Sequence, residues 1–513
     1  MHISNSIVLP IVGLMVRVAL GGASASATKA CQEISKALPS RVSFPLSITY
    51  YNEAREYWST VLRDLKPACV ILPESALDVS AAVTILNKYP DVKFTARSGG
   101  HDPNIGHATV QDGVLISLGK ISGTTYDRNR NVALVKPGGE WNEVIAALNK
   151  EGVTIVGGRL GIVGIGGFLL QGGISFLSSQ YGLAADNVVG WEIVTANGTI
   201  INVNAADQPE LAIALRGSGS QFGIVTQFTV RAYPIGKVWG GMRIYDGSKA
   251  DAIFKALHEF VPYNLQDKKA AIITSNIFAI GGTRAFIMFY FYDGETPPTT
   301  GPFADFLKIG SIIDITKTQT YPELTDILNQ LKSNGFGASL LNSRISFRTL
   351  TLPYIANNGA IYAEISDKMR DITRGFLSNP FKLTSQCSVD FQPLSSIVGQ
   401  HTEARGGNAM GLTGSDPDRL ILEIQCSWSD KNDDDIMRQF SIDLTNWIES
   451  RIPVWIGGEY GPAANVYLPL FMNDAMADQN VTGSYRDYAK FKALQLQADP
   501  QGILRTRTGG FKY

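Results

Sequence analysis

The feature that most constrains this chain is a pair of glycine-rich segments. The first, residues 97–101, reads Arg-Ser-Gly-Gly-His and follows a strand-like run at residues 92–96, and the second occupies residues 157–173. Glycine lets the backbone adopt positive φ and approach a ligand closely, and the exposed amides of such loops form a concave site for an anion such as pyrophosphate. Together the two segments indicate a domain that holds a phosphate-bearing ligand between loops.

The glycine spacing argues against a dinucleotide site of the Rossmann type. Such a site needs the pattern G-x-G-x-x-G between a strand and a helix. After Gly217 and Gly219 the next glycine is Gly223, and the segment around Gly164 also lacks a third glycine at the required place. We therefore expect no nicotinamide-binding domain.

Three further blocks continue the pattern: residues 181–189, residues 191–200 with an Asn-Gly turn, and residues 215–226. In order and spacing the blocks resemble the FAD-binding domain of the vanillyl-alcohol oxidase and p-cresol methylhydroxylase (PCMH) superfamily. Within it the chain resembles the berberine-bridge-enzyme-like oxidoreductases, particularly the secreted fungal enzymes of natural-product pathways, and the similarity extends to residues 498–504 and 509–513. The resemblance implies an α+β fold, with a two-subdomain FAD-binding domain of the PCMH type and an antiparallel-sheet substrate domain backed by helices.

Length and periodicity divide the chain into compact units. Short strands and glycine-rich turns dominate residues 110–234, with one helix expected over residues 141–150. Strand-like runs at residues 270–279 and 284–292 follow, and residues 433–450 have helical spacing. With the resemblance, these patterns predict a signal peptide over residues 1–27, an FAD-binding domain over 28–235, a substrate-binding domain over 236–452, and a C-terminal segment over 453–513 that returns to the FAD-binding domain.

The resemblance implies FAD as the cofactor and His101 as its point of attachment. A ring nitrogen of His101 is expected to bond the flavin methyl carbon; the alternative is a turn histidine that only contacts the cofactor. Some relatives add a second bond through a cysteine, but residues 159–162 contain none, so two links are excluded. The residues expected to contact FAD are Arg97, Ser98, Gly99, Gly100, His101, Gly138, Val163, Gly164, Gly166, Gly167, Gly172, Gly173, Asp186, Asn187, Val188, Gly223 and Ile224.

The chemistry that the resemblance implies is hydride transfer from a substrate carbon to the flavin, assisted by a base. Relatives often place a tyrosine or a carboxylate in that role, and plant relatives carry a glutamate in a region that matches residues 406–412, where this chain has none. The candidates here are Tyr467, Asn408 and Asn473 with the adjacent Asp474; the alternative for each is an ordinary hydrogen-bonded side chain. Molecular oxygen is the expected electron acceptor, admitted past a small aliphatic residue in the segment 186–189.

We therefore expect an FAD-dependent oxidase of a small natural product. The few carboxylates near the recognised substrate segments favour an apolar substrate. Two alternatives stay open, because fold does not determine function: a carbohydrate oxidase, and a flavin-containing cyclase or binding protein without redox turnover. The formal net charge of −1 and the absence of a basic stripe give no case for a nucleic acid or an anionic membrane as partner.

The N-terminus has the pattern of a secretory signal peptide. An apolar run over residues 7–20, interrupted by Arg17, precedes small residues at 23–27. The alternative, a membrane anchor, needs about 20 apolar residues, and this run is shorter. We therefore expect a protein that is secreted or lies in the lumen of the secretory pathway, without stable membrane insertion. Glycosylation sequons at Asn197 and Asn480 fit that location, although the first also suits a hairpin turn.

The four cysteines fit an oxidising compartment. None has the C-x-x-C spacing of a zinc or thioredoxin-type site, and no metal is expected. The resemblance pairs Cys31 with Cys69 in a disulfide, with a buried free thiol as the alternative for either. For Cys387 and Cys426 no firm pairing is predicted.

Overall fold

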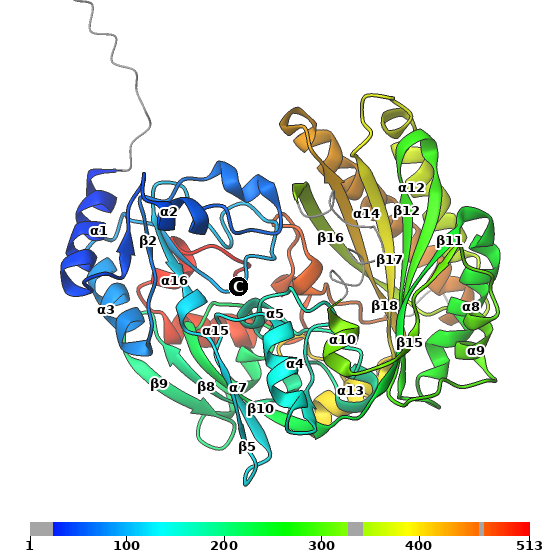
Figure 1. Ribbon diagram of the computed structural model, residues 1–513, viewed down its shortest axis with the longest axis horizontal. Helices are drawn as coiled ribbons and strands as arrows, with labels where there is room; N and C mark the ends of the chain where they lie inside the picture. Colours follow the sequence, from blue (N-terminus) through cyan, green and yellow to red (C-terminus); the bar gives the residue numbers. More distant parts are fainter. Residues whose placement is uncertain (1–23, 327–341, 461–465) are drawn as a thin grey trace, which may run out of the picture.

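The computed structural model describes residues 24–326, 342–460 and 466–513. The chain forms two lobes, and the C-terminal segment returns to the lobe that contains the N-terminal helices (Figure 1). The first lobe holds a four-stranded and a six-stranded sheet, and the second lobe holds an eight-stranded sheet. Helices and strands are both abundant, so the predicted α+β class is confirmed.

One strand of the four-stranded sheet leads directly into the first glycine segment. Its strands are β1 (Val42–Ser43), β2 (Cys69–Ile71), β3 (Phe94–Arg97) and β4 (Val114–Ser117), in the order β1-β2-β4-β3. The helices of this region are α1 (Ala25–Ala37), α2 (Ile48–Glu53), α3 (Ala76–Leu86) and α16 (Ile503–Arg507). Strands β2, β3 and β4 are parallel, and ligands of such sheets bind beyond the carboxyl ends of the strands. The first glycine segment follows β3 directly, so it lies at the carboxyl end of the parallel strands, where ligands of such sheets bind.

Helix α1 bears on the expected signal peptide. Residues 1–23 of that segment lie outside the described residues. Ser24 caps α1, which begins at Ala25, and Ala27 is fully buried. The boundary expected after residue 27 therefore falls inside a packed helix.

The six-stranded sheet is antiparallel and lies beside the second glycine segment. Its strands are β5 (Thr124–Asp127), β6 (Val132–Val135), β7 (Val153–Ile155), β8 (Val188–Val194), β9 (Ile200–Asn204) and β10 (Ile224–Pro234). Its helices are α4 (Trp141–Asn149), α5 (Ile165–Leu170), α6 (Ser178–Tyr181) and α7 (Pro209–Leu215). The expectation of a single helix here was wrong, because α5, α6 and α7 span only four to seven residues and are too short to show a helical period.

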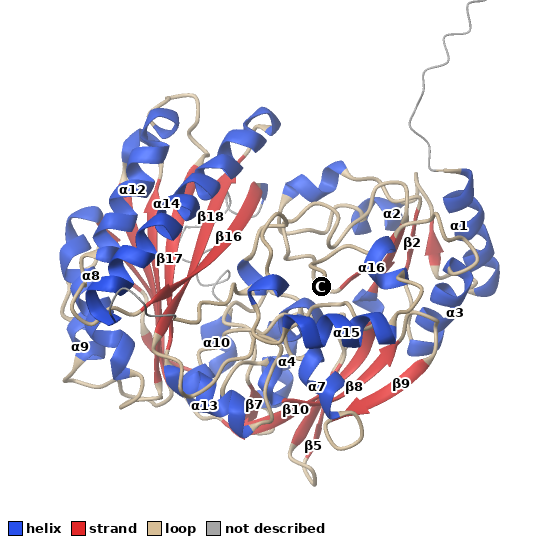
Figure 2. Cartoon of the chain, turned by 180° about the vertical axis from the view of Figure 1, so that it is seen from behind, coloured by secondary structure: helices blue, strands red, loops and turns tan. Residues whose placement is uncertain are grey.

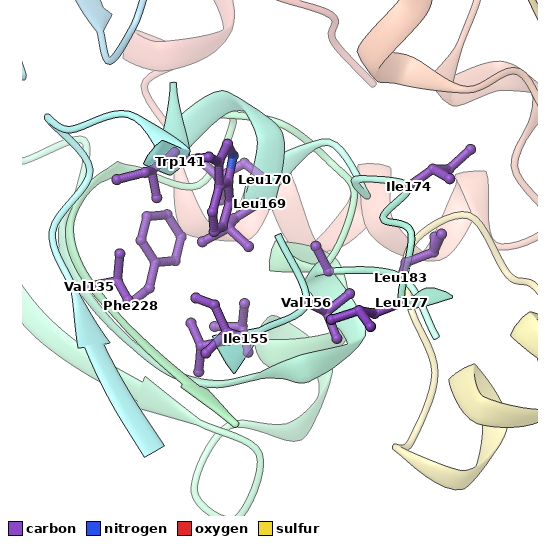
Figure 3. Packing of buried hydrophobic residues seen from close by; sticks show 14 of the residues in the cluster. Val135, Trp141, Ile155, Val156, Leu169, Leu170, Ile174, Leu177, Leu183 and Phe228 are labelled. Atoms are coloured by element: carbon purple, nitrogen blue, oxygen red, sulfur yellow. The ribbon is translucent and has the colours of Figure 1, made fainter. Parts of the chain in front are cut away.

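A buried core around Trp141 explains two glycines of the second segment. Figure 3 shows Trp141 beside Leu169 and Leu170. A Cβ atom on Gly157 or Gly158 would lie 2.5 Å or 2.4 Å from the nearest ring atom of Trp141, closer than side chains pack. Core packing therefore requires these two glycines, whatever ligand the segment binds.

The eight-stranded sheet of the second lobe is antiparallel, in the order β14-β11-β13-β12-β17-β18-β16 with β15 paired to β11. Its strands are β11 (Val238–Asp246), β12 (Ala270–Phe278), β13 (Arg284–Tyr292), β14 (Ile313–Asp314), β15 (Lys317–Gln319), β16 (Arg344–Pro353), β17 (Gln386–Leu394) and β18 (Arg419–Trp428). Helices α8 (Ala250–Tyr263), α12 (Ile361–Leu377) and α14 (Asp434–Tyr460) cover its outer face (Figure 2). The remaining helices are α9 (Pro302–Leu307), α10 (Tyr321–Thr325), α13 (Ser396–Ala404) and α15 (Tyr488–Ala498).

Helix α14 crosses an expected domain boundary. The helix continues through Pro453 to Tyr460, so a boundary between residues 452 and 453 lies within it.

In the described parts of the chain, no helix is both long and apolar enough to span a bilayer.

Residues along the central strands of this sheet face the helix-covered core and a cavity in alternation. Val389, Phe391, Leu422 and Ile424 belong to the core beneath the helices. The residues between them line a cavity on the other face. Because consecutive strand residues point to opposite faces, one sheet supplies both a packed back and a cavity wall.

Two disulfides staple the fold. Cys31–Cys69 joins α1 to β2, with the Cα atoms 6.1 Å apart, and confirms the pairing implied by the resemblance. Cys387–Cys426 joins two directly paired residues of β17 and β18, a link that the sequence pattern did not predict. Register within the sheet, which brings these two sulfur atoms together, is not visible in the sequence.

Replacing Cys31 and Cys69 together by alanine is expected to lower the free energy of unfolding. The bridge closes a separation of 38 residues, and loop-closure entropy of such a loop contributes about 3–4 kcal/mol. Urea unfolding measures the loss. The double variant Cys387→Ala/Cys426→Ala, with a separation of 39 residues, is matched for loop length. Free Cys31 and Cys69 thiols in non-reducing peptide maps of the native protein would contradict the pairing.

Candidate active site

The two glycine-rich segments lie directly against each other. A Cβ atom on Gly99 would lie 2.5 Å from the Gly164 Cα atom, and one on Gly164 would lie 2.4 Å from the Gly99 nitrogen. The Ser98 hydroxyl donates to the Pro137 carbonyl and accepts from the Gly166 amide at 3.0 Å. Only glycine permits so close an approach of two backbones. We call residues 98–101 and 163–167 the glycine cradle.

Arg97 anchors the glycine cradle to helix α2. Its guanidinium donates to the backbone carbonyl and the carboxylate of Glu53 and, at 2.9 Å, to Ser117 Oγ. The Arg97 side chain is 2% exposed, so the ion pair with Glu53 is shielded from water on the arginine side. The guanidinium contacts thus fix where the first loop starts.

A cavity of about 660 Å³ extends from the glycine cradle to the inner face of the eight-stranded sheet. This volume is typical of cofactor and small-molecule sites. Of the residues expected to contact FAD, the cavity wall includes Arg97, Ser98, Gly99, Gly100, His101, Val163, Gly164, Gly166, Gly167, Gly223 and Ile224. The predicted loops and the substrate sheet therefore enclose one continuous space.

Six other residues expected at the cofactor are not part of this wall: Gly138, Gly172, Gly173, Asp186, Asn187 and Val188. Asp186 is buried and accepts hydrogen bonds from the Leu183 amide at 2.9 Å and from Thr402 Oγ1 at 2.8 Å. Asn187 donates to the carbonyls of Tyr181 and Leu183. The side chains of Asp186 and Asn187 thus hold neighbouring loops together, and any contact of theirs with FAD stays a prediction.

His101 lies on the cavity wall beside two aromatic rings. Its ring centroid is 5.1 Å from that of Trp58 and 5.9 Å from that of Phe347, a residue of β16. Burial lowers the pKa of His101 to about 4, against the opposing effect of the nearby Asp102 carboxylate. The imidazole is therefore neutral at pH 7 and keeps an unprotonated nitrogen that can act as a nucleophile.

Two of the predicted catalytic residues lie outside the wall. Tyr467 donates its hydroxyl hydrogen to the Met410 carbonyl and accepts from the Arg486 amide at 3.0 Å. Asn408 is buried and donates to Asp186 Oδ1 at 2.9 Å. Since both polar groups are used to hold loops and neither residue lines the cavity, we do not carry them forward as catalytic candidates.

The third predicted catalytic residue, Asn473, does line the cavity together with its neighbour Asp474. Asn473 Oδ1 accepts from the Gly173 amide at 3.0 Å, which ties the C-terminal segment to the second glycine segment. Its carboxamide therefore has a positioning contact already, while Asp474 belongs to a larger group on the sheet side.

Three carboxyl groups meet on the sheet side of the cavity, which we call the carboxylate cluster: Asp390, Glu423 and Asp474. Asp390 and Glu423 are direct cross-strand partners on β17 and β18. Gln392 donates to Asp474 Oδ2 at 2.9 Å and accepts from the Arg159 guanidinium. Asp390 Oδ1 is buried and has no hydrogen-bond donor among the described residues. The cluster therefore combines one carboxyl group that Gln392 holds in place, that of Asp474, with a second, that of Asp390, whose Oδ1 atom has no partner among the described residues.

Burial raises the pKa of every member of the cluster. The pKa of Asp390 rises to about 7 and that of Asp474 to about 6, and the pKa of Glu423 lies well above its usual value. For Asp390 the rise is opposed by hydrogen bonding from the Ser275 and Ser388 hydroxyls. Repulsion within the cluster adds to the rise for Asp390 and Glu423, while the Arg159 charge opposes it for all three. Protonated and ionised carboxyl groups therefore coexist near neutral pH, as acid–base chemistry requires.

The sequence reasoning named Asp474 but missed Asp390 and Glu423, which lie outside the segments recognised as substrate-facing. A usable signal was present in β17 and β18, where Asp390 stands between Val389 and Phe391 and Glu423 between Leu422 and Ile424. A charged residue between apolar neighbours marks a face that is not simply core. Only strand register, however, shows that the two meet.

Comparisons with known proteins identify the family. A model of the FAD binding domain matches residues 67–204. An uncharacterized FAD-linked oxidoreductase of Arthroderma benhamiae is 34% identical over 477 residues, covering 92% of each chain. The FAD-dependent monooxygenase drtC of Aspergillus calidoustus is 31% identical, covering 91% of this chain and 86% of that protein, and the bifunctional solanapyrone synthase of Alternaria solani is 28% identical, covering 94% and 88%. The chain belongs to the FAD-linked oxidoreductases.

Solved structures share the fold. BBE-like 1 of Physcomitrella patens superposes with a TM-score of 0.72 at 19% identity, covering 92% of this chain and 97% of that one. For 6-hydroxy-D-nicotine oxidase from Arthrobacter nicotinovorans the TM-score is 0.68 at 20% identity, covering 91% and 97%. These similarities confirm the fold that the sequence resemblance implied.

The cavity fits FAD. The glycine cradle brings two backbones together where a Cβ atom has no room, and the neutral His101 ring lies at its end. The cradle, Gly223 and Ile224 would hold the cofactor, which leaves the sheet side of the cavity for a substrate.

Proposed function

We propose that this protein is an FAD-dependent oxidase that removes a hydride from a small natural product, with the flavin bonded to His101 and reoxidised by molecular oxygen. The observation that carries the proposal is one cavity whose wall holds His101 and the glycine cradle from the first lobe and the carboxylate cluster from the second. When bound, the flavin supplies the two-electron acceptor. The fungal relatives, one of them named a solanapyrone synthase, support a natural-product substrate.

Asp390 is placed to accept the proton that a substrate hydroxyl loses as its carbon is oxidised. Its Oδ1 atom is buried without a donor in the described part of the chain, and a pKa of about 7 suits a base near neutral pH. Burial also raises the pKa of Glu423 well above its usual value, which favours the protonated form that can donate a hydrogen bond to the substrate. Arg159 and Gln392 hold Asp474 in place, and the Arg159 charge stabilises the ionised form of the cluster.

Anaerobic addition of candidate substrates to the purified protein tests the proposal. The yellow flavin band is expected to bleach with a natural-product alcohol, and the oxidised product is expected to appear in equal amount. Product formation with an unchanged flavin band would instead identify a cyclase without redox turnover.

Oxygen use is tested by product analysis in air. One hydrogen peroxide per substrate is expected from an oxidase. Since relatives are named monooxygenases, the reaction is also run under ¹⁸O₂, and label in the product would contradict the oxidase proposal.

The route of oxygen is tested by changing one valine. Val188 begins strand β8 and accepts at its carbonyl from Arg216 Nη2 at 3.0 Å, away from the wall. Val163 lines the cavity beside Gly164. We therefore expect Val163→Phe to slow flavin reoxidation in stopped-flow experiments, with Val188→Ile as the matched control. If flavin reoxidation slows only in Val188→Ile, oxygen passes Val188, in the segment 186–189 that the sequence predicted, and not Val163.

A carbohydrate oxidase is the second candidate. Gln386, Ser388 and Gln425 face the cavity from β17 and β18 and could bind sugar hydroxyls. Glucose and oligosaccharides in the same bleaching assay distinguish the two functions.

We also propose that the protein is secreted. The two disulfides support an oxidising compartment, and Asn197 and Asn480 are both exposed, as glycan attachment requires. A mobility shift after enzymatic deglycosylation of the protein recovered from culture medium tests this proposal.

A further inference from the structure

The inner face of the eight-stranded sheet changes from apolar to polar across its width. One transverse row of directly paired residues crosses β11, β13, β12, β17 and β18. In that order it consists of Ile244, Ile287, Ser275, Asp390 and Glu423. All five line the cavity. Two branched aliphatic side chains are therefore followed by a hydroxyl and then by two carboxyl groups.

Neighbouring rows repeat this division. Ile277 pairs with Ser388, which pairs with Gln425, and Ile273 pairs with Phe289. We call the first group the apolar half of the wall: Ile244, Ile273, Ile277, Ile287 and Phe289. The polar half comprises Gln386, Ser388, Asp390, Gln392, Glu423, Gln425 and Ser427.

Most of the apolar half is open to the cavity. Ile273 and Phe289 also pack against the core around Trp141, whereas Ile244, Ile277 and Ile287 belong to no core cluster of the described residues. Ile287 and Phe289 are half-buried, whereas Phe286, Met288 and Tyr290, which alternate with them, are buried against the helices. Apolar surface that meets only cavity water is unfavourable, and a hydrocarbon that covers it is stabilised in proportion to the area covered.

The polar half imposes the opposite requirement. An entirely apolar ligand over Asp390 and Gln425 would remove water from their polar atoms without replacing its hydrogen bonds, which is costly. An entirely polar ligand would leave Ile277 and Ile287 uncovered. The two halves together therefore select a molecule that is itself divided.

We propose that the substrate is an amphipathic alcohol that lies across the sheet, with its hydrocarbon body on the apolar half and its hydroxyl on the polar half beside Asp390. This inference rests on the proposed function and specifies its substrate class. Oxidation breaks the carbinol C–H and O–H bonds and forms a C=O bond; the hydride reduces the flavin, the proton goes to Asp390, and oxygen takes up the electrons as hydrogen peroxide.

The length of the body follows from strand spacing. Three strand-to-strand steps separate Asp390 from Ile244, so the two lie roughly 14 Å apart. A hydrocarbon body of about that length reaches the far edge of the apolar half.

The test uses 4-n-alkylbenzyl alcohols, from methyl to hexyl, with the flavin-loaded protein. Binding is measured by perturbation of the flavin absorbance and by calorimetry, neither of which needs turnover. Affinity is expected to rise by up to about fourfold for each added methylene. Glucose is expected to bind far more weakly than the hexyl compound, and 4-hexylbenzylamine no better than its alcohol.

Two variants with opposite changes in polarity test which half of the wall binds which part of the substrate. Ile287→Gln is expected to flatten the dependence on chain length while leaving the methyl compound little affected. Gln425→Leu is expected to weaken all homologues alike and to leave the chain-length dependence intact. Ile312→Gln and Gln439→Leu, at exposed positions outside the cavity, are the matched controls.

Several outcomes would overturn the inference: affinity independent of chain length, tighter binding of glucose or of the amine, equal effects of the two variants, or no binding by any probe. These are distinct from failure of the proposed function. Binding with the expected chain-length dependence but no bleaching would support the amphipathic site and overturn the oxidase. Bleaching by glucose alone would support the oxidase and overturn the amphipathic site.

Discussion

His101→Ala is expected to release all of its FAD when the protein is precipitated with acid, whereas the wild-type pellet stays yellow. The neutral imidazole, with a pKa lowered to about 4 by burial, is a nucleophile in the folded protein, and alanine removes it. Absorbance of the supernatant and the mass of the flavin-bearing tryptic peptide measure the result.

His258→Ala is the matched control for this experiment. His258 packs on Tyr354 at 4.9 Å between ring centroids in the second lobe and does not line the cavity. Its flavin should remain in the pellet. If flavin washes completely out of the precipitated wild-type protein, the covalent bond is wrong, although FAD binding would survive that result.

Asp390→Asn is expected to lower kcat by about 10²–10⁴-fold, the usual contribution of a positioned base. The flavin content should not change, because Asp390 belongs to the sheet and not to the glycine cradle. In the wild-type protein kcat should rise as pH increases through about 7, the pKa to which burial raises Asp390, and this rise should vanish in the variant.

The same substitution should change how stability depends on pH. Burial raises the pKa of Asp390 in the folded state above its unfolded value, so the folded state holds the proton more tightly. The resulting stabilisation is present at low pH and is lost as pH rises from about 4 to about 7. Urea unfolding of Asp390→Asn should therefore show a shallower decline over this interval.

Asp371→Asn, at an exposed position of α12, is the control for the loss of one carboxyl group. An Asp390→Asn enzyme that keeps the wild-type pH profile would assign the base to another member of the carboxylate cluster. Glu423→Gln and Asp474→Asn then identify which one.

The glycine cradle could be predicted because its requirements are local, and the family resemblance placed its two segments at one cofactor. Gly99 and Gly164 are needed where two backbones meet, and that need appears as glycine in each segment separately. The same reasoning does not separate ligand glycines from packing glycines, since Gly157 and Gly158 adjoin them in sequence yet serve the Trp141 ring.

The substrate side could not be predicted because it depends on strand register. Asp390 and Glu423 become neighbours only when β17 and β18 pair as they do. Tyr467 and Asn408 were predicted from the resemblance of their segments to substrate-side segments of the family, but their polar groups bond to Met410 and Asp186. Residue type indicates what a side chain can do, whereas the partners that it meets depend on packing of distant segments.

The division of the eight-stranded sheet into a packed back and a cavity wall has a consequence for how such enzymes diversify. Helix-facing residues such as Val389 and Ile424 carry the core, and the Cys387–Cys426 link joins the two strands on that side. The residues that alternate with them on the same strands face the cavity and do not form part of that core. Point mutations at the cavity-facing residues, which are every second residue of these strands, can therefore change the preferred substrate with little effect on folding. New specificities can then arise through single mutations, without an unstable intermediate.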